Sequence, residues 1–510
     1  MENRRIRVRF APSPTGPLHI GGVRTALFNY FFAKKHGGDF ILRIEDTDSQ
    51  RFVPGAEEYI NDSLKWCGIR VDEGVREGGK YAPYKQSERK HIYKQFADQL
   101  ISSGNAYYAF DKPEVLEELR KADEAKGETF TYNYRIRNSM ETSMALSPEE
   151  VKQRIANGEQ WVIRFKMPEG LDITMSDLIR GEVVVNSSTL DDKVLFKSSD
   201  MLPTYHLANV TDDYLMEITH VIRGEEWLPS LPLHVMLYRA FGWESKMPKF
   251  AHLPLLLKPT GNGKLSKRDG DKMGFPVFPL CWKSPEGEIA RGYREDGYFP
   301  EAFVNLLALL GWNPGTEQEL FTMNELIELF SLERVNKSGA RFDPDKAKWF
   351  NHQYLIQKNN SDLAKSFNEL LKLKGIAVDQ VKLERIVALV KERVNFVHEM
   401  WNQANFFFET PTLYDGTTVK KIWKEDVPDM LSNLIEVIKG IEPFTSEKIE
   451  LTLKDYIGTQ NLGMGKVMNN LRICLVGESK GPGIADICDL LGKEETINRI
   501  RQAIEKIKPC

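Results

Sequence analysis

The order of apolar and polar positions near the N-terminus predicts a strand, a helix and a second strand. Residues 6–11, IRVRFA, alternate between apolar and charged side chains, as a half-buried strand does. PSPTG then forces a turn, residues 22–35 place apolar side chains near one helical face, and HGG signals the end of a helix. FILRIED, from residue 40, predicts another strand. This order predicts a parallel α/β sheet with a ligand crevice at the carboxyl end of the first strand.

The hydrophobic pattern changes twice further along the chain. From about residue 114 to residue 169, charged helical stretches such as PEVLEELRKADEAKG are separated by polar loops. KVLFKSSD and PTYHLANVTDDYLMEITHVIRGEEW are strand-like, so we expect the α/β sheet to resume near residue 191, after an insertion. Beyond residue 271 the pattern is mostly helical to the end, with a joint expected at residues 350–360.

Length and composition are those of an ordinary globular protein with about three domains: 510 residues, 41% hydrophobic and 28% charged. The formal net charge of -4 argues against a protein that holds nucleic acid by bulk charge, so an RNA partner must meet local basic patches. The five cysteines form no CxxC pair, which predicts reduced thiols and no cysteine-rich metal site. No apolar run is long enough to span a bilayer and no signal peptide fits, so we expect a cytoplasmic protein without membrane contact.

The turn after the first strand, APSPTGPLHIGG, carries one histidine and two glycines. A glycine turn that enters a helix presents unpaired backbone N–H groups and the positive end of the helix dipole, which suits a phosphate. His19 can donate to a phosphoryl oxygen, and Gly21 and Gly22 let a ligand approach the backbone closely. An ordinary strand-to-helix turn with an incidental surface histidine accounts for these residues equally well.

A second candidate lies in GNGKLSKRDGD, residues 261–271, which we call the lysine loop. Lys264, Lys267 and Arg268 fall within five positions on a loop that Gly261 and Gly263 loosen. Flexible lysines can follow polyphosphate oxygens as charge develops in a transition state. A solvated basic loop is the alternative for such a run of charge.

Together the two motifs resemble the signatures of class I aminoacyl-tRNA synthetases. HIGG corresponds to the family's His-Ile-Gly-His, and KLSKR to its Lys-Met-Ser-Lys-Ser. The resemblance narrows to the bacterial-type glutamyl-tRNA synthetases through RFAPSPTGPLHIGG, RIEDTDSQR, PTYHLANVTDD, VIRGEEWLPSLPLHVMLYRAFGW and KLSKRDG. It implies a Rossmann-like class I catalytic domain with an α/β insertion, in which the two motifs flank ATP from opposite sides. It also implies that mostly α-helical stem-contact and anticodon-binding domains follow.

The resemblance assigns residues to two neighbouring sites. It implies that the catalytic residues are His19, Lys264 and Lys267. The residues that match the family's ATP contacts are Thr15, Gly16, His19, Gly21, Gly22, Lys264, Ser266, Lys267 and Arg268. Those that match its glutamate contacts are Arg9, Ala11, Ser13, Glu45, Tyr205, Asn209 and Arg223. Arginine suits the two carboxylates of glutamate and an acidic residue suits its ammonium, although Arg9 taken alone could be an edge-strand charge, Tyr205 a core aromatic and Glu45 a helix cap.

The family's reaction gives these residues their expected roles. Glutamate's α-carboxylate attacks the α-phosphorus of ATP, pyrophosphate leaves, and the terminal 2′-hydroxyl of tRNA(Glu) then attacks the adenylate. The nucleophile is already an anion, so the first step needs positioning and charge neutralisation more than a general base. The resemblance implies that His19 contacts the ATP phosphates, that the two lysines contact the pyrophosphate, and that activation depends on bound tRNA. Mg²⁺ is expected to arrive with ATP, because we interpret IEDTD as a turn rather than a metal site.

The resemblance also divides the chain into domains. The expected ranges are 1–105 and 191–260 for the two halves of the catalytic domain, 106–190 for an inserted domain that holds the tRNA acceptor end, 261–360 for the lysine-loop and stem-contact region, and 361–510 for the helical anticodon-binding domain. Some relatives bind zinc in the insertion through three cysteines and a histidine. The region from GNAYYAFDKP to YNYRIRNS contains neither residue type, so we predict no zinc. We interpret the phenylalanines of NFFFE, from residue 405, as core, and expect a monomer.

Two features depart from the family. Gly22 replaces the second histidine of the general motif, at a position where glutamyl members commonly accept a small residue. The stretch after Arg268, DGDKMGFPVFPLCWKSPEGEIARGYREDGYFPEA, is longer than the family's usual link by roughly a dozen residues or more, beyond common loop lengths. We expect this extra segment to be a surface elaboration that affects closure of the lysine loop.

Other functions stay open at this point. The nearest are a non-discriminating enzyme that also charges tRNA(Gln), and a glutaminyl-tRNA synthetase, whose tail is typically a β-barrel rather than helical. A shorter paralogue that glutamylates a modified tRNA base lacks an anticodon domain. A catalytically silent RNA-binding relative is disfavoured by two intact motifs, and a nucleotidylyltransferase by the blocks that resemble the glutamate pocket.

Overall fold

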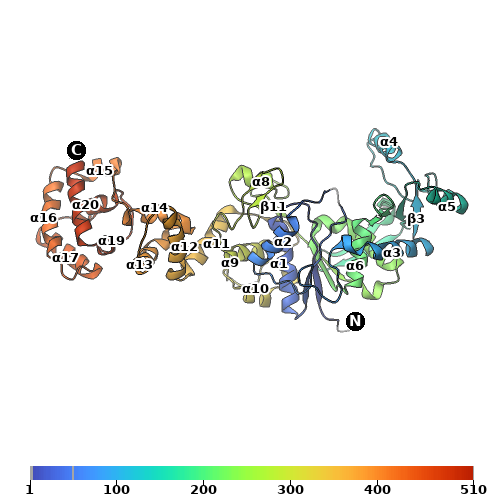
Figure 1. The fold of residues 1–510 in the computed structure, drawn as a ribbon, viewed down its shortest axis with the longest axis horizontal. Helices are drawn as coiled ribbons and strands as arrows, with labels where there is room; N and C mark the ends of the chain where they lie inside the picture. The colour runs from blue at the N-terminus through green and yellow to red at the C-terminus, as the bar shows by residue number, and fades with distance from the viewer. Residues whose placement is uncertain (1–3, 49–50, 509–510) are drawn as a thin grey trace. The chain divides into compact units, whose positions relative to one another are not determined.

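The computed structural model describes residues 4–48 and 51–508, which divide into two compact units (Figure 1). The first unit ends at Ala347 and the second begins at Lys348. The division lies inside helix α11 (Pro344–Gln357), close to the joint predicted at residues 350–360.

The first unit is built on a six-stranded sheet with the order β2-β1-β9-β10-β5-β6. Neighbouring strands run parallel except for the antiparallel pair β5 and β6. The strands are β1 (Arg7–Phe10), β2 (Asp39–Leu42), β5 (Asp172–Asp177), β6 (Gly181–Asn186), β9 (His220–Gly224) and β10 (Lys249–Leu253). The predicted α/β class with a parallel sheet is confirmed.

The predicted strand, helix and strand at the N-terminus are confirmed as β1, α1 (Ile20–Lys35) and β2. β1 is buried along its whole length, as expected of a strand inside a parallel sheet. α1 is buried over most of its circumference because it contacts the sheet as well as α9 (Pro300–Leu309) and α10 (Met323–Leu329). The turn between β1 and α1 therefore lies at the carboxyl end of the parallel strands, where ligands bind in such sheets.

A smaller antiparallel sheet has the order β3-β4-β7-β8. Its strands are β3 (Ala106–Ala109), β4 (Val162–Phe165), β7 (Val194–Lys197) and β8 (Leu202–Pro203), and the nearby helices are α3 (Lys90–Ser102), α4 (Pro113–Glu124) and α5 (Pro148–Ala156) (Figure 1). The two sheets are interleaved along the chain. β5 and β6 fall within the predicted insertion but extend the main sheet, whereas β7 and β8 follow the insertion but belong to the small sheet. The domain boundaries themselves stay a prediction.

One stretch has a different structure from the one its sequence predicts. In the strand-like stretch PTYHLANVTDDYLMEITHVIRGEEW, β9 is a strand as predicted, whereas residues 205–215 form the helix α6 (Tyr205–Leu215). The prediction is wrong because tyrosine, valine and threonine, which favour strands, lie here on a helix. The spacing of four residues places Tyr205, Asn209 and Asp213 on one face of that helix.

The rest of the first unit consists of helices and short strands. They are α2 (Ala56–Trp66), α7 (Leu231–Ala240), β11 (Leu256–Leu257), α8 (Lys267–Met273), β12 (Trp282–Lys283), β13 (Ile289–Ala290) and β14 (Ala340–Arg341). β11 pairs with β14, and β12 with β13. The lysine loop follows β11 and includes the first residues of α8. The extra segment, which follows Arg268, contains the β12–β13 hairpin.

The second unit is helical, as the resemblance implies. Its helices after α11 are α12 (Asn360–Leu373), α13 (Gln380–Val390), α14 (Met400–Ala404), α15 (Gly416–Ile422), α16 (Val427–Lys439), α17 (Ser446–Thr459), α18 (Met464–Val476), α19 (Ile484–Leu491) and α20 (Lys493–Lys506). Phe406 and Phe407 of NFFFE are each 5% exposed, so these two rings belong to the core, as predicted.

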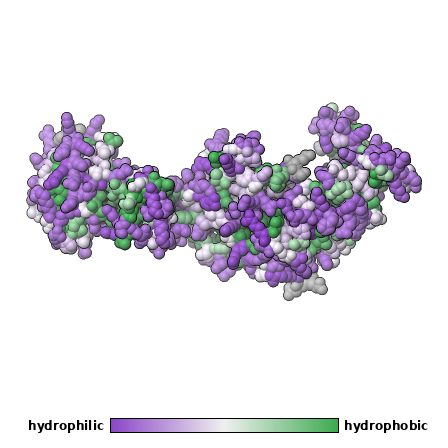
Figure 2. Space-filling view, viewed as in Figure 1, coloured by the Kyte–Doolittle hydropathy of each residue, from purple (hydrophilic) through white to green (hydrophobic). Residues whose placement is uncertain are grey.

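Polar residues predominate on the face of the molecule shown in Figure 2, with apolar residues in small areas between them. Within the described ranges, no helix is both long enough and apolar enough to cross a membrane.

Candidate active site

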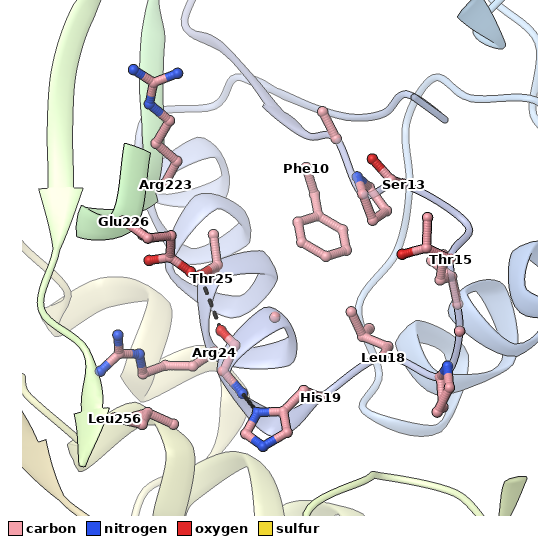
Figure 3. Close-up of a pocket in the computed structure, with 18 of the residues that line it drawn as sticks. Phe10, Ser13, Thr15, Leu18, His19, Arg24, Thr25, Arg223, Glu226 and Leu256 are labelled. Atoms are coloured by element: carbon pink, nitrogen blue, oxygen red, sulfur yellow. Dashed lines mark hydrogen bonds between the residues drawn. The ribbon is translucent and has the colours of Figure 1, made fainter. Parts of the chain in front are cut away.

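A cavity of about 630 Å³ lies in the first unit at the carboxyl ends of β1 and β9. Residues that the sequence singles out line much of it: Arg9, Ala11, Ser13, Thr15, Gly16, His19, Gly21, Gly22, Glu45, Tyr205, Asn209, Arg223, Lys264 and Lys267. Ser266 and Arg268 are not among the lining residues. Figure 3 shows His19 and Arg223 well apart among the residues drawn, and we call the two parts of the cavity the His19 end and the Arg223 end.

His19 occupies the N-cap position of α1. Its Nδ1 accepts a hydrogen bond from the Gly21 backbone N–H at 3.1 Å (Figure 3). An accepting Nδ1 carries no proton, so the neutral ring carries its proton on Nε2. Burial, with a smaller contribution from Lys264, lowers the pKa of His19 to about 4. At neutral pH His19 is therefore an uncharged donor, and its buried Nε2 has no hydrogen-bond partner among the described residues.

The backbone N–H groups at the start of α1 are already paired. Ile20 donates to the Val277 carbonyl at 2.9 Å, and Gly22 to the His19 carbonyl at 2.8 Å. Gly21 donates to His19 Nδ1. The prediction of unpaired N–H groups ready for a phosphate is therefore wrong for these three residues. The buried His19 Nε2–H is one donor that this turn leaves for a ligand.

Lys264 and Lys267 reach the His19 end from the lysine loop, each beside a carboxylate. Lys264 Nζ lies 2.9 Å from Glu226, and Lys267 Nζ lies 3.5 Å from Glu288. The four side chains are all at least 44% exposed. Exposed ion pairs are weak, so both lysines can exchange their carboxylates for an anionic ligand.

The other residues of the lysine motif have local contacts. Ser266 donates its backbone N–H and its hydroxyl to the Asp269 carboxylate at the start of α8. Arg268 is exposed. The loop before them is anchored by Arg341, which donates to the carbonyl oxygens of Lys258, Pro259 and Gly261.

The extra segment after Arg268 contributes side chains to the cavity wall, so it is more than the predicted surface elaboration, although residues 285–289 are exposed. Its effect on closure of the lysine loop stays a prediction. Phe278 and Trp282 line the cavity. The Phe278 ring packs edge to face with His19 at a centroid distance of 6.1 Å, and Trp282 packs edge to face with Tyr59 at 5.2 Å. The segment also buries several apolar side chains: Phe275, Val277, Phe278, Leu280, Ala290 and Tyr293.

The Arg223 end contains a buried network of charged side chains. Arg9 Nε lies 3.1 Å from Asp213, and Arg43 lies 2.7 Å from Asp213 and 2.9 Å from Glu45. Asn209 donates to the same Glu45 oxygen at 3.1 Å. Burial raises the pKa of Glu45 against the opposing effect of Arg43 and Arg9, whereas these two arginines outweigh burial and lower the pKa of Asp213. Two guanidiniums and two carboxylates thus balance each other in this network.

Arg223 stands outside this balanced network. It is 5% exposed, and it donates through Nε to His252 at 3.0 Å, through Nη1 to Tyr205 at 3.0 Å and through Nη2 to the Trp227 carbonyl at 3.3 Å. These acceptors are neutral, and within the described part of the chain no carboxylate lies at ion-pair distance from Arg223. A buried guanidinium without a carboxylate partner suits an anionic ligand.

Sequence reasoning missed Arg43 and Asp213, although both stand in the quoted blocks. Arg43 precedes Glu45 by two positions, which is the same-face spacing of an extended strand. Asp213 follows Asn209 by four positions, which is the same-face spacing of a helix. The signal for Asp213 is legible only once residues 205–215 are recognised as helical.

Comparison with protein families identifies two regions of the chain. Residues 5–349 match the family described as tRNA synthetases class I (E and Q), catalytic domain. Residues 362–504 match an anticodon binding domain.

Similar proteins extend over almost the whole chain. A glutamate–tRNA ligase of Porphyromonas gingivalis is 60% identical over 506 residues and covers 99% of both chains, and one of Flavobacterium johnsoniae is 59% identical over 505 residues, 99% of this chain and 100% of the relative. A crystal structure of a glutamate tRNA ligase from Elizabethkingia meningosepticum, in complex with its amino acid, has a TM-score of 0.96 and 52% identity and covers 99% of this chain and 100% of that one. The chain therefore belongs to the class I tRNA synthetases of the E and Q type.

Proposed function

We propose that the chain is a glutamate–tRNA ligase, which activates L-glutamate with ATP and transfers it to the 3′-terminal adenosine of tRNA(Glu). The observation that carries the proposal is a single cavity with phosphate donors at its His19 end and, at its Arg223 end, a buried guanidinium that has no carboxylate partner among the described residues. The glutamate–tRNA ligase names of relatives 59–60% identical over nearly the whole chain support it.

Charge at the Arg223 end fits L-glutamate better than glutamine. The carboxylates of Glu45 and Asp213 balance the guanidiniums of Arg9 and Arg43. Arg223 has no carboxylate at ion-pair distance among the described residues, so one positive charge is left over. A ligand with two carboxylates and one ammonium carries the one negative charge that balances it. Arg223 offers its positive charge and the second Nη2 hydrogen to a carboxylate, and Glu45 offers an acceptor for the ammonium. Glutamine, which has no net charge, leaves the positive charge unbalanced.

MgATP is the proposed second substrate, at the His19 end. His19 donates its Nε2–H to a phosphoryl oxygen without adding charge. Lys264 and Lys267 leave their carboxylate partners and follow the pyrophosphate as its negative charge grows. Mg²⁺ accompanies the nucleotide, and the proposal includes no zinc.

The two reaction steps place different demands on these residues. The α-carboxylate of glutamate attacks the α-phosphorus of ATP, forming the adenylate while pyrophosphate leaves. This nucleophile is already an anion, so alignment and charge neutralisation suffice. The 2′-hydroxyl of the tRNA terminus then attacks the glutamyl carbonyl carbon, and AMP leaves. In this proposal the enzyme acts as a cytoplasmic monomer whose second unit contacts the anticodon.

Exchange of pyrophosphate into ATP, measured with glutamate in the presence and absence of purified tRNA(Glu) and tRNA(Gln), tests the proposal. We expect glutamate-dependent exchange when tRNA(Glu) is present. Lack of exchange under every condition contradicts the enzyme function. Exchange that needs glutamine identifies a glutaminyl enzyme, and charging of both tRNAs with glutamate identifies a non-discriminating one.

Lys267→Ala tests the role of the lysine loop. We expect a fall in the exchange rate of about 100-fold or more, because removing one well-placed donor to developing charge costs a factor of this size. Binding of tRNA(Glu) should change little. The matched control is Lys272→Ala, an exposed lysine on the same helix that does not line the cavity. Near-normal exchange by Lys267→Ala contradicts the assigned role.

A further inference from the structure

A buried histidine links Arg223 to a carboxylate that Arg223 does not touch. His252 Nε2 lies 3.0 Å from Arg223 Nε, and His252 Nδ1 lies 2.7 Å from Asp177. The three side chains are at most 5% exposed. They come from three neighbouring strands: Asp177 ends β5, His252 lies on β10, and Arg223 lies on β9 directly opposite His252 in register.

Chemistry fixes the direction of both hydrogen bonds. The Nε of an arginine always carries a hydrogen, so His252 Nε2 must accept. The proton of the neutral imidazole then lies on Nδ1 and is donated to Asp177. The Asp177 carboxylate is itself held by the backbone N–H groups of Ile179 and Arg180, at 2.9 Å and 2.8 Å. The histidine ring is therefore fixed at both nitrogens.

We propose that His252 and Asp177 are positioning residues that hold Arg223 for a carboxylate of the amino-acid substrate. The proposal rests on the proposed glutamate–tRNA ligase function. His252 accepts from Nε of the guanidinium, Tyr205 and His234 Nδ1 both lie at hydrogen-bond distance from Nη1, and the Trp227 carbonyl accepts from Nη2. The plane of the guanidinium is thereby set before the substrate binds, and the remaining Nη2 hydrogen is preorganised for a carboxylate oxygen.

The histidine also separates Arg223 from the negative charge of Asp177. Arg9 contacts Asp213 directly, and its charge is balanced by that contact. Arg223 receives orientation from Asp177 only through the neutral ring of His252, so its positive charge stays available to a ligand. The hydrogen-bonded chain from Arg223 through His252 to Asp177, which we call the relay, therefore orients the guanidinium and leaves its charge without a directly bonded carboxylate.

Steady-state exchange kinetics of His252 variants of the full chain, in the presence of tRNA(Glu), test this inference. We expect His252→Phe, which keeps the ring but accepts no hydrogen bond, to raise the KM for glutamate roughly 10- to 100-fold. The KM for ATP should change less than about threefold, since the His19 end is untouched. His252→Gln, whose amide oxygen can accept from Arg223, should recover most of the affinity for glutamate.

Asp177→Asn tests the second half of the relay. Its amide group can donate to His252 Nδ1, which moves the histidine proton to Nε2 and sets two donors against each other at Arg223. We expect the KM for glutamate to rise about tenfold or more with the KM for ATP unchanged. The matched control is His220→Phe, a buried histidine on β9 that does not line the cavity.

The outcomes separate this inference from the proposed function. A wild-type protein without exchange contradicts the proposed function. A wild-type protein that exchanges, together with folded His252→Phe or Asp177→Asn proteins whose KM for glutamate is unchanged, contradicts the relay alone. Equal increases in the KM for glutamate and for ATP, or no recovery in His252→Gln, show a merely structural role and also contradict it. If His252→Phe does not fold, Asp177→Asn and His252→Gln decide by the same measurements.

Discussion

Asp213 joins the two guanidiniums of Arg9 and Arg43 inside the first unit, where none of the three side chains is more than 4% exposed to screening by solvent. Buried charges lose their hydration, and direct contact with an opposite charge offsets that loss only while both partners remain. Removal of the Asp213 charge leaves the two buried guanidiniums of Arg9 and Arg43 with Glu45 as the one carboxylate of the described network. The residue therefore stabilises the empty site as well as shaping it.

We expect Asp213→Asn to lower the free energy of unfolding of the first unit by about 3–5 kcal/mol, the range typical for a broken buried ion pair. Urea titration of the full chain, with a probe in the first unit, measures this loss. The matched control is Asp98→Asn, which removes a half-exposed partner of Lys94 four residues away on α3 and should cost about 1 kcal/mol or less. Equal losses of unfolding free energy in the two variants would contradict the claim that the buried ion pairs of Asp213 stabilise the first unit more than an exposed ion pair does.

At the scale of elements, the extra segment joins parts of the chain that the two phosphate motifs alone do not connect. The Val277 carbonyl accepts from the first N–H of α1, and Phe278 packs on His19. The same segment supplies Glu288, the partner of Lys267. A single stretch therefore contacts both motifs of the His19 end.

Trp282→Ala should raise the KM for ATP roughly three- to tenfold, because the cavity wall loses an aromatic side chain that packs on Tyr59. The KM for glutamate should stay near its wild-type value, since Trp282 does not contact the charged network. The matched control is Ile289→Ala, on the same hairpin but 69% exposed. The same increase in both variants would indicate a general loosening of the hairpin rather than a direct part in the nucleotide site.

The elements that the sequence predicts well are those whose pattern is decided locally. β1, α1 and β2 have strong periodicity and clear turn residues, and the structure places them as predicted. α6 was not predictable in this way, since the strand preference of its residues is overridden by packing against α3, α7, β7 and β8. The same limit applies to His252, which looks like an ordinary strand residue until β9 is laid beside it.

The extra segment shows a second limit of sequence reasoning. Its length marks it as unusual, but its position on the cavity depends on contacts with Tyr59 and His19, more than 200 residues away in the chain. Most of the lining residues that the sequence identifies lie within the motifs that match the family. Phe278 and Trp282 lie outside those motifs, so their place in the cavity wall is known only from the structure.

For the whole molecule, buried histidines make the first unit sensitive to acid. Burial is the largest cause that lowers the pKa of His19, His206 and His220 to about 4, and it also lowers the pKa of His234 and His252. The unfolded chain, with histidine pKa values near 6.5, binds more protons than the folded chain between about pH 6.5 and pH 4. Stability is therefore present above pH 6.5 and is lost as the pH falls through this window.

We expect the free energy of unfolding of the first unit to fall as the pH is lowered from 7 to 5, by as much as about 1.4 kcal/mol per pH unit for each such histidine. Burial raises the pKa of Glu45 and Asp192, which opposes the trend with fewer groups. Urea titrations at several pH values measure the slope. His220→Gln should make it shallower, and a slope unchanged by this substitution would contradict the account.

The interleaving of the two sheets along the chain determines which segments can be deleted without damage to either sheet. Excision of residues 106–190 removes β3 and β4 from the small sheet, and it also removes β5 and β6 from the edge of the main sheet. Only β7 and β8 of the small sheet remain, and Asp177 is lost from beside His252. Residues 106–190 are therefore not a self-contained module that could be inserted or deleted as one piece. Loss of this segment damages both sheets at once.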